Sequence, residues 1–496
     1  MKKLFILLII QLLLILEISA QEITVRLSLN DALELAREQS LQAFLNEHYY
    51  MAHYWAYRSY RADYLPSVSL QANPLSYSNA SRLRYNSNTQ TDEYIRTENL
   101  SSDLQMNISQ KLAATGGTFF LESELGRIEN FGNNDYQQYS SVPFRLRYRQ
   151  KLFGFNPMKW QRKIEPLKFE KAKKEYIQSV EEMHISTIRH FFNLIRATIS
   201  LEMAETNMKN TKNLLKTARR RFELGTVSRE ELLDLRLSEN NDGIAWQEAK
   251  LNYREANENL LNFLMLPVDT ELDIKIPDKM PVTGVDVERV LQNALDNNPE
   301  LLQLKQQILE NKRNVAEAKA GRHFSADINV SYGISKDDGN LMKDGNIGTV
   351  YQPDFDNHQM VSVGVNIPIL DWGRKKGQYE MAKSRKQIAE VSARKTLQQF
   401  EQNAMTRAIA FNIQKSKVES AALSDTLASE SYELTMTRFK TGKADVLRLT
   451  NSQKAKDKAT LQYINALSEY WDSYFYLRKL TLYDFENEEV LEFEEF

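Results

Sequence analysis

The stretch RFELGTVS at residues 221–228 recurs as RFKTGKAD at residues 438–445, 217 positions later. In both copies a long glycine-free segment ends at a Gly, and a residue able to cap a helix stands three positions after it. The pattern predicts two sharp turns, each between two helices. Because a repeat over so long an interval indicates internal duplication, we expect the chain to consist of two copies of one unit.

The two copies also align outside these turns. Residues 29–62 and 287–320 predict helices of equal length, each followed by a strand-like segment. Residues 167–224 and 378–441 contain neither Gly nor Pro and predict very long helices. A helix over 378–441 would be about 100 Å long. Each half is therefore expected to run helix, strands, very long helix, turn, helix.

The segments between the helices alternate polar and apolar residues. This alternation is unbroken over residues 103–109 and 143–149 in the first half, and over 326–332 and 361–367 in the second. Period two predicts a sheet with one apolar and one polar face. The apolar face would meet lipid in a transmembrane barrel, or form the core of a soluble sandwich. Alternation alone does not separate the two, but an export signal favours the barrel.

Arg145, Arg147 and Arg149 share one face of a predicted strand. On the barrel interpretation they point into the lumen, because Arg on the lipid face costs about 2–4 kcal/mol at the membrane midplane. They would then either form a basic lining that favours anionic solutes or pair with Asp or Glu on a neighbouring strand.

The first 20 residues predict a cleaved signal peptide. Lys2 and Lys3 precede an apolar core over residues 4–16, and the small residue Ala20 precedes a mature start at Gln21. An uncleaved anchor is the alternative. The chain has no Cys, which excludes disulfides, thiolate metal sites and an N-terminally lipidated cysteine.

The composition argues against nucleic-acid binding and catalysis. The 64 basic and 66 acidic residues give a net charge of −2, which provides no field to hold nucleic acid. The six His residues are scattered without metal-ligand spacing, and the sequence has neither a nucleophile elbow nor a phosphate-binding Gly-Lys-Ser/Thr. We predict no enzyme activity, no metal and no cofactor.

At this point the residues resemble the TolC family of outer-membrane channel proteins. The resemblance rests on the twofold repeat, the opening LSLNDAL at residues 27–33, the strand end IPILDWG at residues 367–373, and the two Arg-Phe-x-x-Gly tips. It implies an α plus transmembrane β fold with two internal repeats. In a homotrimer, each protomer would give four strands to one shared outer-membrane β-barrel and its helices to a periplasmic α-helical barrel. Four strands cannot close a barrel, and open edges are not tolerated in lipid, so symmetric closure is expected.

The resemblance implies a passive exit duct of a tripartite efflux or type I secretion system, which receives substrates from a periplasmic adaptor (membrane fusion) protein and an inner-membrane pump. The sequence does not decide between efflux and secretion. The alternative is a soluble periplasmic structural coiled-coil scaffold with β insertions. The expected organisation is a signal peptide at 1–20, a first repeat at 21–266 with strands at about 66–153, a linker at 267–284, a second repeat at 285–483 with strands at about 324–370, and an acidic tail at 484–496, predicted to be disordered or loosely packed.

The helix tips are the candidate docking surface. Gly225 and Gly442 stand where a helix ends in the left-handed conformation, Ser228 predicts a capping box with Glu231, and Asp445 predicts an N-cap. These residues also suffice as plain turn formers. The resemblance adds that the tips form the periplasmic entrance and bind the adaptor, through Arg221, Phe222, Gly225, Ser228, Arg438, Phe439, Gly442, Lys443 and Asp445.

The entrance departs from the acidic ring that the family often carries after the second tip. Here the corresponding positions hold Arg448 and Asn451, and the equivalent positions of the first copy hold Glu231 and Asp234. We hypothesise that Glu231 or Asp234 pairs with Arg448 across neighbouring hairpins and helps to hold the entrance closed. The alternative is a solvated charged helix surface. The segment around Thr115 looks like a branch of the family with a longer first strand region, and its hairpin is left unplaced.

Overall fold

A computed structural model describes residues 24–86, 89–131, 136–268, 270–277, 280–343, 346–350 and 354–493. The chain divides into two compact units. The helical unit comprises residues 1–51, 171–301 and 396–496, and the sheet unit comprises 52–170 and 302–395. The predicted signal peptide at 1–20 lies outside the described residues.

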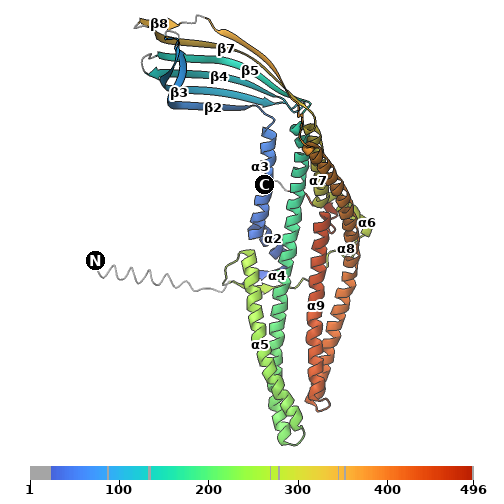
Figure 1. Cartoon of the computed structure of the whole chain (residues 1–496). Helices are drawn as coiled ribbons and strands as arrows, with labels where there is room; N and C mark the ends of the chain where they lie inside the picture. The colour runs from blue at the N-terminus through green and yellow to red at the C-terminus, as the bar shows by residue number, and fades with distance from the viewer. Residues whose placement is uncertain are drawn as a thin grey trace, which may run out of the picture. The chain divides into compact units, whose positions relative to one another are not determined.

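Two long helical hairpins dominate the helical unit (Figure 1). The first consists of α4 (Pro157–Glu223) and α5 (Arg229–Leu264), and the second of α8 (Arg374–Lys440) and α9 (Val446–Thr481); α4 and α8 continue into the sheet unit. No described helix is long and apolar enough to cross a membrane. The other helices and the short strands are β1 (Thr24–Leu27), α2 (Leu29–Gln39), α3 (Leu41–Ala62), β6 (Glu271–Ile274), α6 (Val287–Asn297), α7 (Pro299–Gly321), β10 (Tyr483–Asp484) and β11 (Glu489–Val490).

The main core of the helical unit lies where α4 meets α9 and α8. On α4 the fully buried residues Ile188, Phe191, Phe192 and Ile195 recur at helical spacing and form one apolar face. The rings of Phe411 on α8 and of Tyr470 and Tyr474 on α9 belong to the same cluster. Burial of this face holds the two hairpins together, since isolated helices gain most of their stability from tertiary packing.

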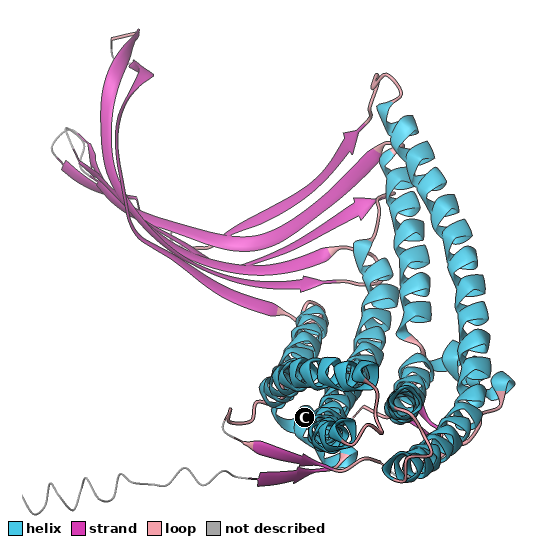
Figure 2. Ribbon diagram, turned by 90° about the horizontal axis from the view of Figure 1, so that it is seen from below, coloured by secondary structure: helices cyan, strands magenta, loops and turns pink. Residues whose placement is uncertain are grey.

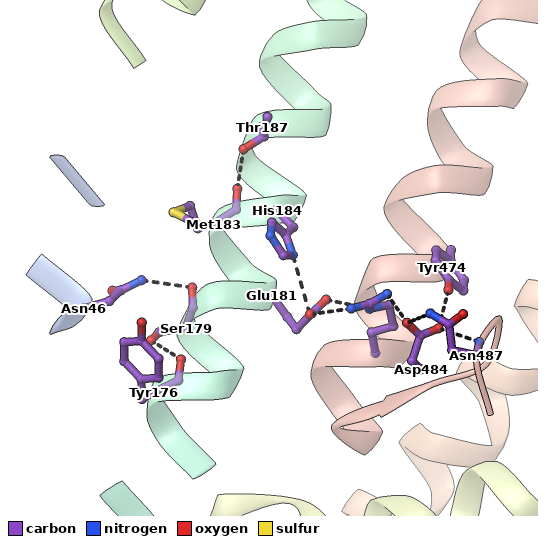
Figure 3. A network of polar contacts seen from close by, with 11 residues as sticks. Asn46, Tyr176, Ser179, Glu181, Met183, His184, Thr187, Tyr474, Asp484 and Asn487 are labelled. Carbon is purple, nitrogen blue, oxygen red and sulfur yellow. Dashed lines mark hydrogen bonds and ion pairs between the residues drawn. The ribbon is translucent and has the colours of Figure 1, made fainter. Parts of the chain in front are cut away.

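A buried ion network joins α4, α9 and the C-terminal segment (Figure 3). The Arg478 guanidinium contacts both carboxylate oxygens of Glu181 at 3.1 Å and Asp484 Oδ2 at 2.9 Å. Burial acts to raise the pKa of Glu181, but hydrogen bonding to His184 and the charge of Arg478 outweigh it and hold that pKa below its ordinary value. The pKa of Asp484 is likewise held low against burial, chiefly by the charge of Arg478.

The acidic tail is packed rather than loose, which corrects the sequence prediction over the described residues up to 493. The backbone N–H groups of Glu486 and Asn487 donate to Asp484, and the Phe493 ring lies 4.4 Å from that of Tyr50 and 5.4 Å from that of Tyr176. The acidic composition of the tail predicted disorder. Composition does not show that the carboxylate of Asp484 and the ring of Phe493 are held by contacts with the rest of the chain.

The sheet unit carries one antiparallel seven-stranded sheet among the described residues (Figure 2). Its order is β2-β3-β4-β5-β7-β8, with β9 also paired to β7. The expectation of four strands per chain is therefore wrong for this protein, because the previously unplaced hairpin is the β3–β4 turn within the sheet. The strands are β2 (Ser67–Asn86), β3 (Thr91–Lys111), β4 (Thr118–Phe131), β5 (Tyr136–Leu152), β7 (Ser325–Lys343), β8 (Asn346–Val350) and β9 (Asp356–Asn366).

Candidate functional site: helix tips and a two-faced sheet

The first tip is a tight turn closed by backbone hydrogen bonds. Gly225 has φ +74°, and the amides of Gly225 and Thr226 donate to the carbonyls of Phe222 (3.0 Å) and Arg221 (2.9 Å). This is the left-handed helix end that Gly adopts without strain. The following helix α5 begins with a full capping box: Ser228 Oγ accepts from the Glu231 amide at 3.1 Å, and the Glu231 carboxylate accepts from the Ser228 amide at 3.0 Å.

The second tip repeats this backbone with a different cap. Gly442 has φ +75°, and the Lys443 amide donates to the Arg438 carbonyl at 2.8 Å. Asp445 Oδ1 accepts from the Arg448 amide at 2.7 Å. Arg448 therefore occupies the position that Glu231 holds in the first copy, and its side chain cannot return a hydrogen bond as acceptor.

Arg221 joins the two tips within one chain. Its guanidinium donates to the carbonyls of Phe439 (3.4 Å) and Lys440 (2.9 Å) in the C-terminal turn of α8, where the Phe439 carbonyl also accepts the Gly442 amide. Beneath it lies a small apolar cluster of buried side chains from all four helices of the hairpins. The cluster comprises Leu215, Ala218, Leu235, Tyr432, Met436, Phe439, Val446 and Leu449.

The two tip phenylalanines lie in different environments. Phe439 is 7% exposed and packs in this cluster, whereas Phe222 is 41% exposed. The neighbouring Leu224 is 78% exposed. Of the residues predicted to dock a partner, Phe222 therefore offers an accessible apolar surface, while Phe439 holds the tip together.

The four gating candidates do not pair within the chain. Glu231 holds the Ser228 backbone, and Asp234, Arg448 and Asn451 are exposed. Across the described part of the tips, no ion pair joins Arg448 to Glu231 or Asp234. Pairing between neighbouring hairpins of different copies stays a prediction.

The three strand arginines lie on the polar face of the sheet, together with a carboxylate that the sequence did not single out. Glu122 on β4 is only 5% exposed, faces Arg145 in the register and forms ion pairs with Arg145 (3.7 Å) and Arg147. Arg149 donates to Asn329 Oδ1 at 3.2 Å. Of the two outcomes the sequence left open, the structure has pairing with a neighbouring strand for Arg145 and Arg147, which share the one carboxylate of Glu122, whereas Arg149 contacts a neutral amide.

The opposite face of the sheet is apolar and exposed. In the register, Ile108 on β3 is flanked by Val68 on β2 and Leu121 on β4, and Leu121 faces Leu146 on β5. Exposed side chains on this face extend from β2 across to β9. They include Val68, Leu70, Leu104, Met106, Leu121, Leu146, Tyr332, Val361, Val363 and Val365. A continuous apolar surface of this size marks contact with another apolar phase or partner.

The part of the chain that the structure describes contains no group of three or more acidic or His side chains placed to hold a metal. The tips and the sheet offer surfaces and charges rather than convergent catalytic groups.

Comparison with known proteins agrees with this geometry. Residues 290–481 match the family described as Outer membrane efflux protein, a family of transport channels rather than enzymes. No curated protein matches the chain. The Campylobacter jejuni CmeC outer membrane channel is similar over 94% of this chain and 87% of its own, with 16% identity and a TM-score of 0.63. CusC is similar over 91% of both chains, with 13% identity and a TM-score of 0.61.

A third solved structure extends the likeness. The outer membrane protein VceC from Vibrio cholerae is similar over 91% of this chain and 95% of its own, with 13% identity and a TM-score of 0.57. At these identities the likeness shows the fold, which is that of outer-membrane channels with long helices and β-strands. The fold class predicted from the sequence is confirmed.

Proposed function

We propose that the chain is the exit duct of a tripartite efflux system, because residues 290–481 match the outer membrane efflux protein family. It passively conducts substrates from a periplasmic adaptor and an inner-membrane pump to the exterior. Its place is the outer membrane, with a periplasmic extension. The predicted signal peptide at 1–20 would direct export.

The observation that carries the proposal is the two-faced sheet. One face is a broad exposed apolar surface, and the other is polar with its buried charge compensated by Arg145 and Arg147. A soluble sandwich would bury its apolar face against a second sheet. A lipid-facing barrel instead needs an apolar outside and a polar inside.

Closure of that sheet supports a homotrimer. In the part of the chain that is described, β2 and β9 each pair on one side only. Unpaired strand edges are costly in lipid, so β2 of one copy must pair with a strand at the far edge of the next. A closed ring of identical copies satisfies every edge.

The tips are the proposed docking surface for the adaptor. Phe222 and Leu224 supply exposed apolar contacts, and Arg221, Ser228, Arg438, Gly442, Lys443 and Asp445 keep the two turns in shape or present charge beside them. An adaptor with an amphipathic helical end would cover the exposed apolar side chains and leave the charged side chains beside the turns exposed to solvent.

The test combines fractionation, native mass and conductance. The protein should resist carbonate extraction from outer membranes, show the mass of a trimer in detergent, and insert into planar bilayers with discrete conductance steps. A monomer that washes off membranes and never conducts would overturn the duct and favour the periplasmic coiled-coil scaffold.

A further inference from the structure

The tip end of the helical unit is strongly basic in a chain that is otherwise slightly acidic. Residues 216–236 hold six Lys or Arg against four Asp or Glu, and residues 433–453 hold four against two. The two tips thus carry a local excess of four positive charges, although the whole chain has a net charge of −2.

All of these cations except the half-buried Arg221 are exposed, and within the described tips none forms an ion pair in the chain. By contrast, two of the acids are engaged by backbone, because the carboxylates of Glu231 and Asp445 accept amide hydrogen bonds at the helix starts. We call the exposed cations nearest the turns the basic collar: Arg220, Arg229, Arg438, Lys440, Lys443 and Arg448.

Helix stability accounts for only part of the collar. Arg220, Arg438 and Lys440 lie in the last turns of α4 and α8, where cations interact favourably with the negative end of the helix dipole. Lys443 and Arg448 lie at the start of α9, where the dipole end is positive and a cation is unfavourable.

The comparison between the two copies sharpens this point. The first copy has Glu231 at the third helical position and gains a full capping box, whereas the second has Arg448 there and keeps only the Asp445 half. The second tip therefore has a less favourable helix start together with a positive charge. The stability of the helix start does not explain why Arg448 stands where the first copy has Glu231. The positive charge of Arg448 therefore has a role of its own.

We propose that the basic collar makes the periplasmic opening anion-selective, so that the duct favours anionic solutes. The inference rests on the proposed function, because a trimer would bring roughly twelve excess positive charges around one opening. At physiological salt a field of this kind extends about 8 Å from the charges, which covers a narrow opening. Glu122 pairs with Arg145 and Arg147 and offsets part of the charge of the strand arginines, so a variant of Arg149 is included in the test below.

The expected size of the effect follows from the potential. A potential of about 1 kT at the collar would enrich chloride about 2.7-fold and deplete potassium by the same factor, for a chloride-to-potassium permeability ratio of about 7. Because screening weakens exposed charges, the ratio should fall towards 1 as salt rises to the molar range.

The experiment measures reversal potentials of the purified trimer in a planar bilayer under a KCl gradient. The wild type should favour chloride, and Lys443→Glu/Arg448→Glu should shift the permeability ratio several-fold towards potassium. Lys305→Glu/Lys312→Glu is the matched control, since it removes two exposed lysines of α7 and introduces the same change in charge. It should leave the ratio unchanged. If the charge-reversal variant does not assemble into trimers, Lys443→Gln/Arg448→Gln replaces it, and the permeability ratio should again shift towards potassium.

The outcomes separate this inference from the duct itself. Absence of any conductance would refute the proposed function. Conductance with a preference for potassium in the wild type would refute the collar and leave the duct standing. A ratio that responds to Arg149→Gln on the sheet but not to the Lys443 and Arg448 variants would also refute it, because selectivity would then lie in the barrel.

Discussion

Replacement of Arg478 by Met tests whether the buried ion network fixes the C-terminal segment to the two long hairpins. Arg478 lies between Glu181 on α4 and Asp484 just after α9, and both carboxylates are less than 10% exposed. The variant keeps a side chain of similar length and removes the charge. It leaves two buried carboxylates without their cation.

The magnitude follows from burial. Loss of one partner of a buried pair costs about 3–5 kcal/mol, because the other charge is left in a medium that solvates it poorly. Arg189→Met is the matched control on the same pair of helices. Arg189 contacts Asp472 at 2.8 Å but is 59% exposed, and exposed pairs contribute only about 0.2–1 kcal/mol.

Hydrogen exchange measured by mass spectrometry on the detergent-solubilised protein reports the local free energy of opening. In peptides covering 177–187 and 474–487, a loss of about 3 kcal/mol corresponds to roughly 150-fold faster exchange for Arg478→Met. The double variant Glu181→Gln/Arg478→Met should recover part of this loss, since it removes one of the two unpaired charges.

The pH dependence gives a second readout. The folded-state pKa values of Glu181 and Asp484 lie below their ordinary values, so their contribution is present above about pH 4.5 and is lost as pH falls through the lowered pKa values. In Arg478→Met the pKa of Glu181 rises relative to the wild type, because burial is then opposed by His184 without the charge of Arg478. The deficit of the variant should therefore shrink from pH 7 to pH 4.5. Equal exchange rates in Arg478→Met and Arg189→Met at pH 7 would refute the reasoning.

Two further predictions concern the tips. Arg221→Gln should speed hydrogen exchange in the last turn of α8 by at least tenfold, because two hydrogen bonds from a charged group to its carbonyls are lost. The control Lys216→Gln, at the same end of α4 as Arg221, should leave that exchange rate unchanged. Equal exchange rates in the two variants would exclude the link between the tips. Gly442→Ala should destabilise its hairpin by about 1 kcal/mol, because the φ of Gly442 is +75°. Gly243→Ala should be neutral or stabilising, because Gly243 lies in the middle of α5 with open space around it. If urea unfolding ranks the stabilities of the two variants the other way, the assigned turn is wrong.

The sequence was informative where one residue type imposes one backbone. The two Gly positions predicted the tip turns, because only Gly adopts the left-handed conformation without strain. Alternation over residues 143–149 predicted which strand face is polar, because side chains point to opposite faces in turn. Neither inference needs knowledge of a partner strand.

The sequence was silent where the answer depends on register. Glu122 faces Arg145 only because β4 and β5 pair with a bulge between residues 122 and 124, and one extra residue changes which side chains oppose each other. Sequence alone could have pointed to Glu122 through the alternation of residues 118–125, but not to its burial. The predicted number of strands was wrong for a similar reason. The sequence of the hairpin near Gly116 does not show whether its strands join the sheet, or at which edge of the sheet they would pair.

The repeat itself carried a different error, because equal motifs suggested equal roles. Phe222 and Phe439 occupy the same place in the two copies, yet only Phe222 is accessible. Phe439 is covered because it packs among the buried side chains of both hairpins, and Arg221 of the first tip donates to its carbonyl and to that of Lys440. Duplication supplied two turns with the same backbone, and packing between the hairpins gave their phenylalanines different environments.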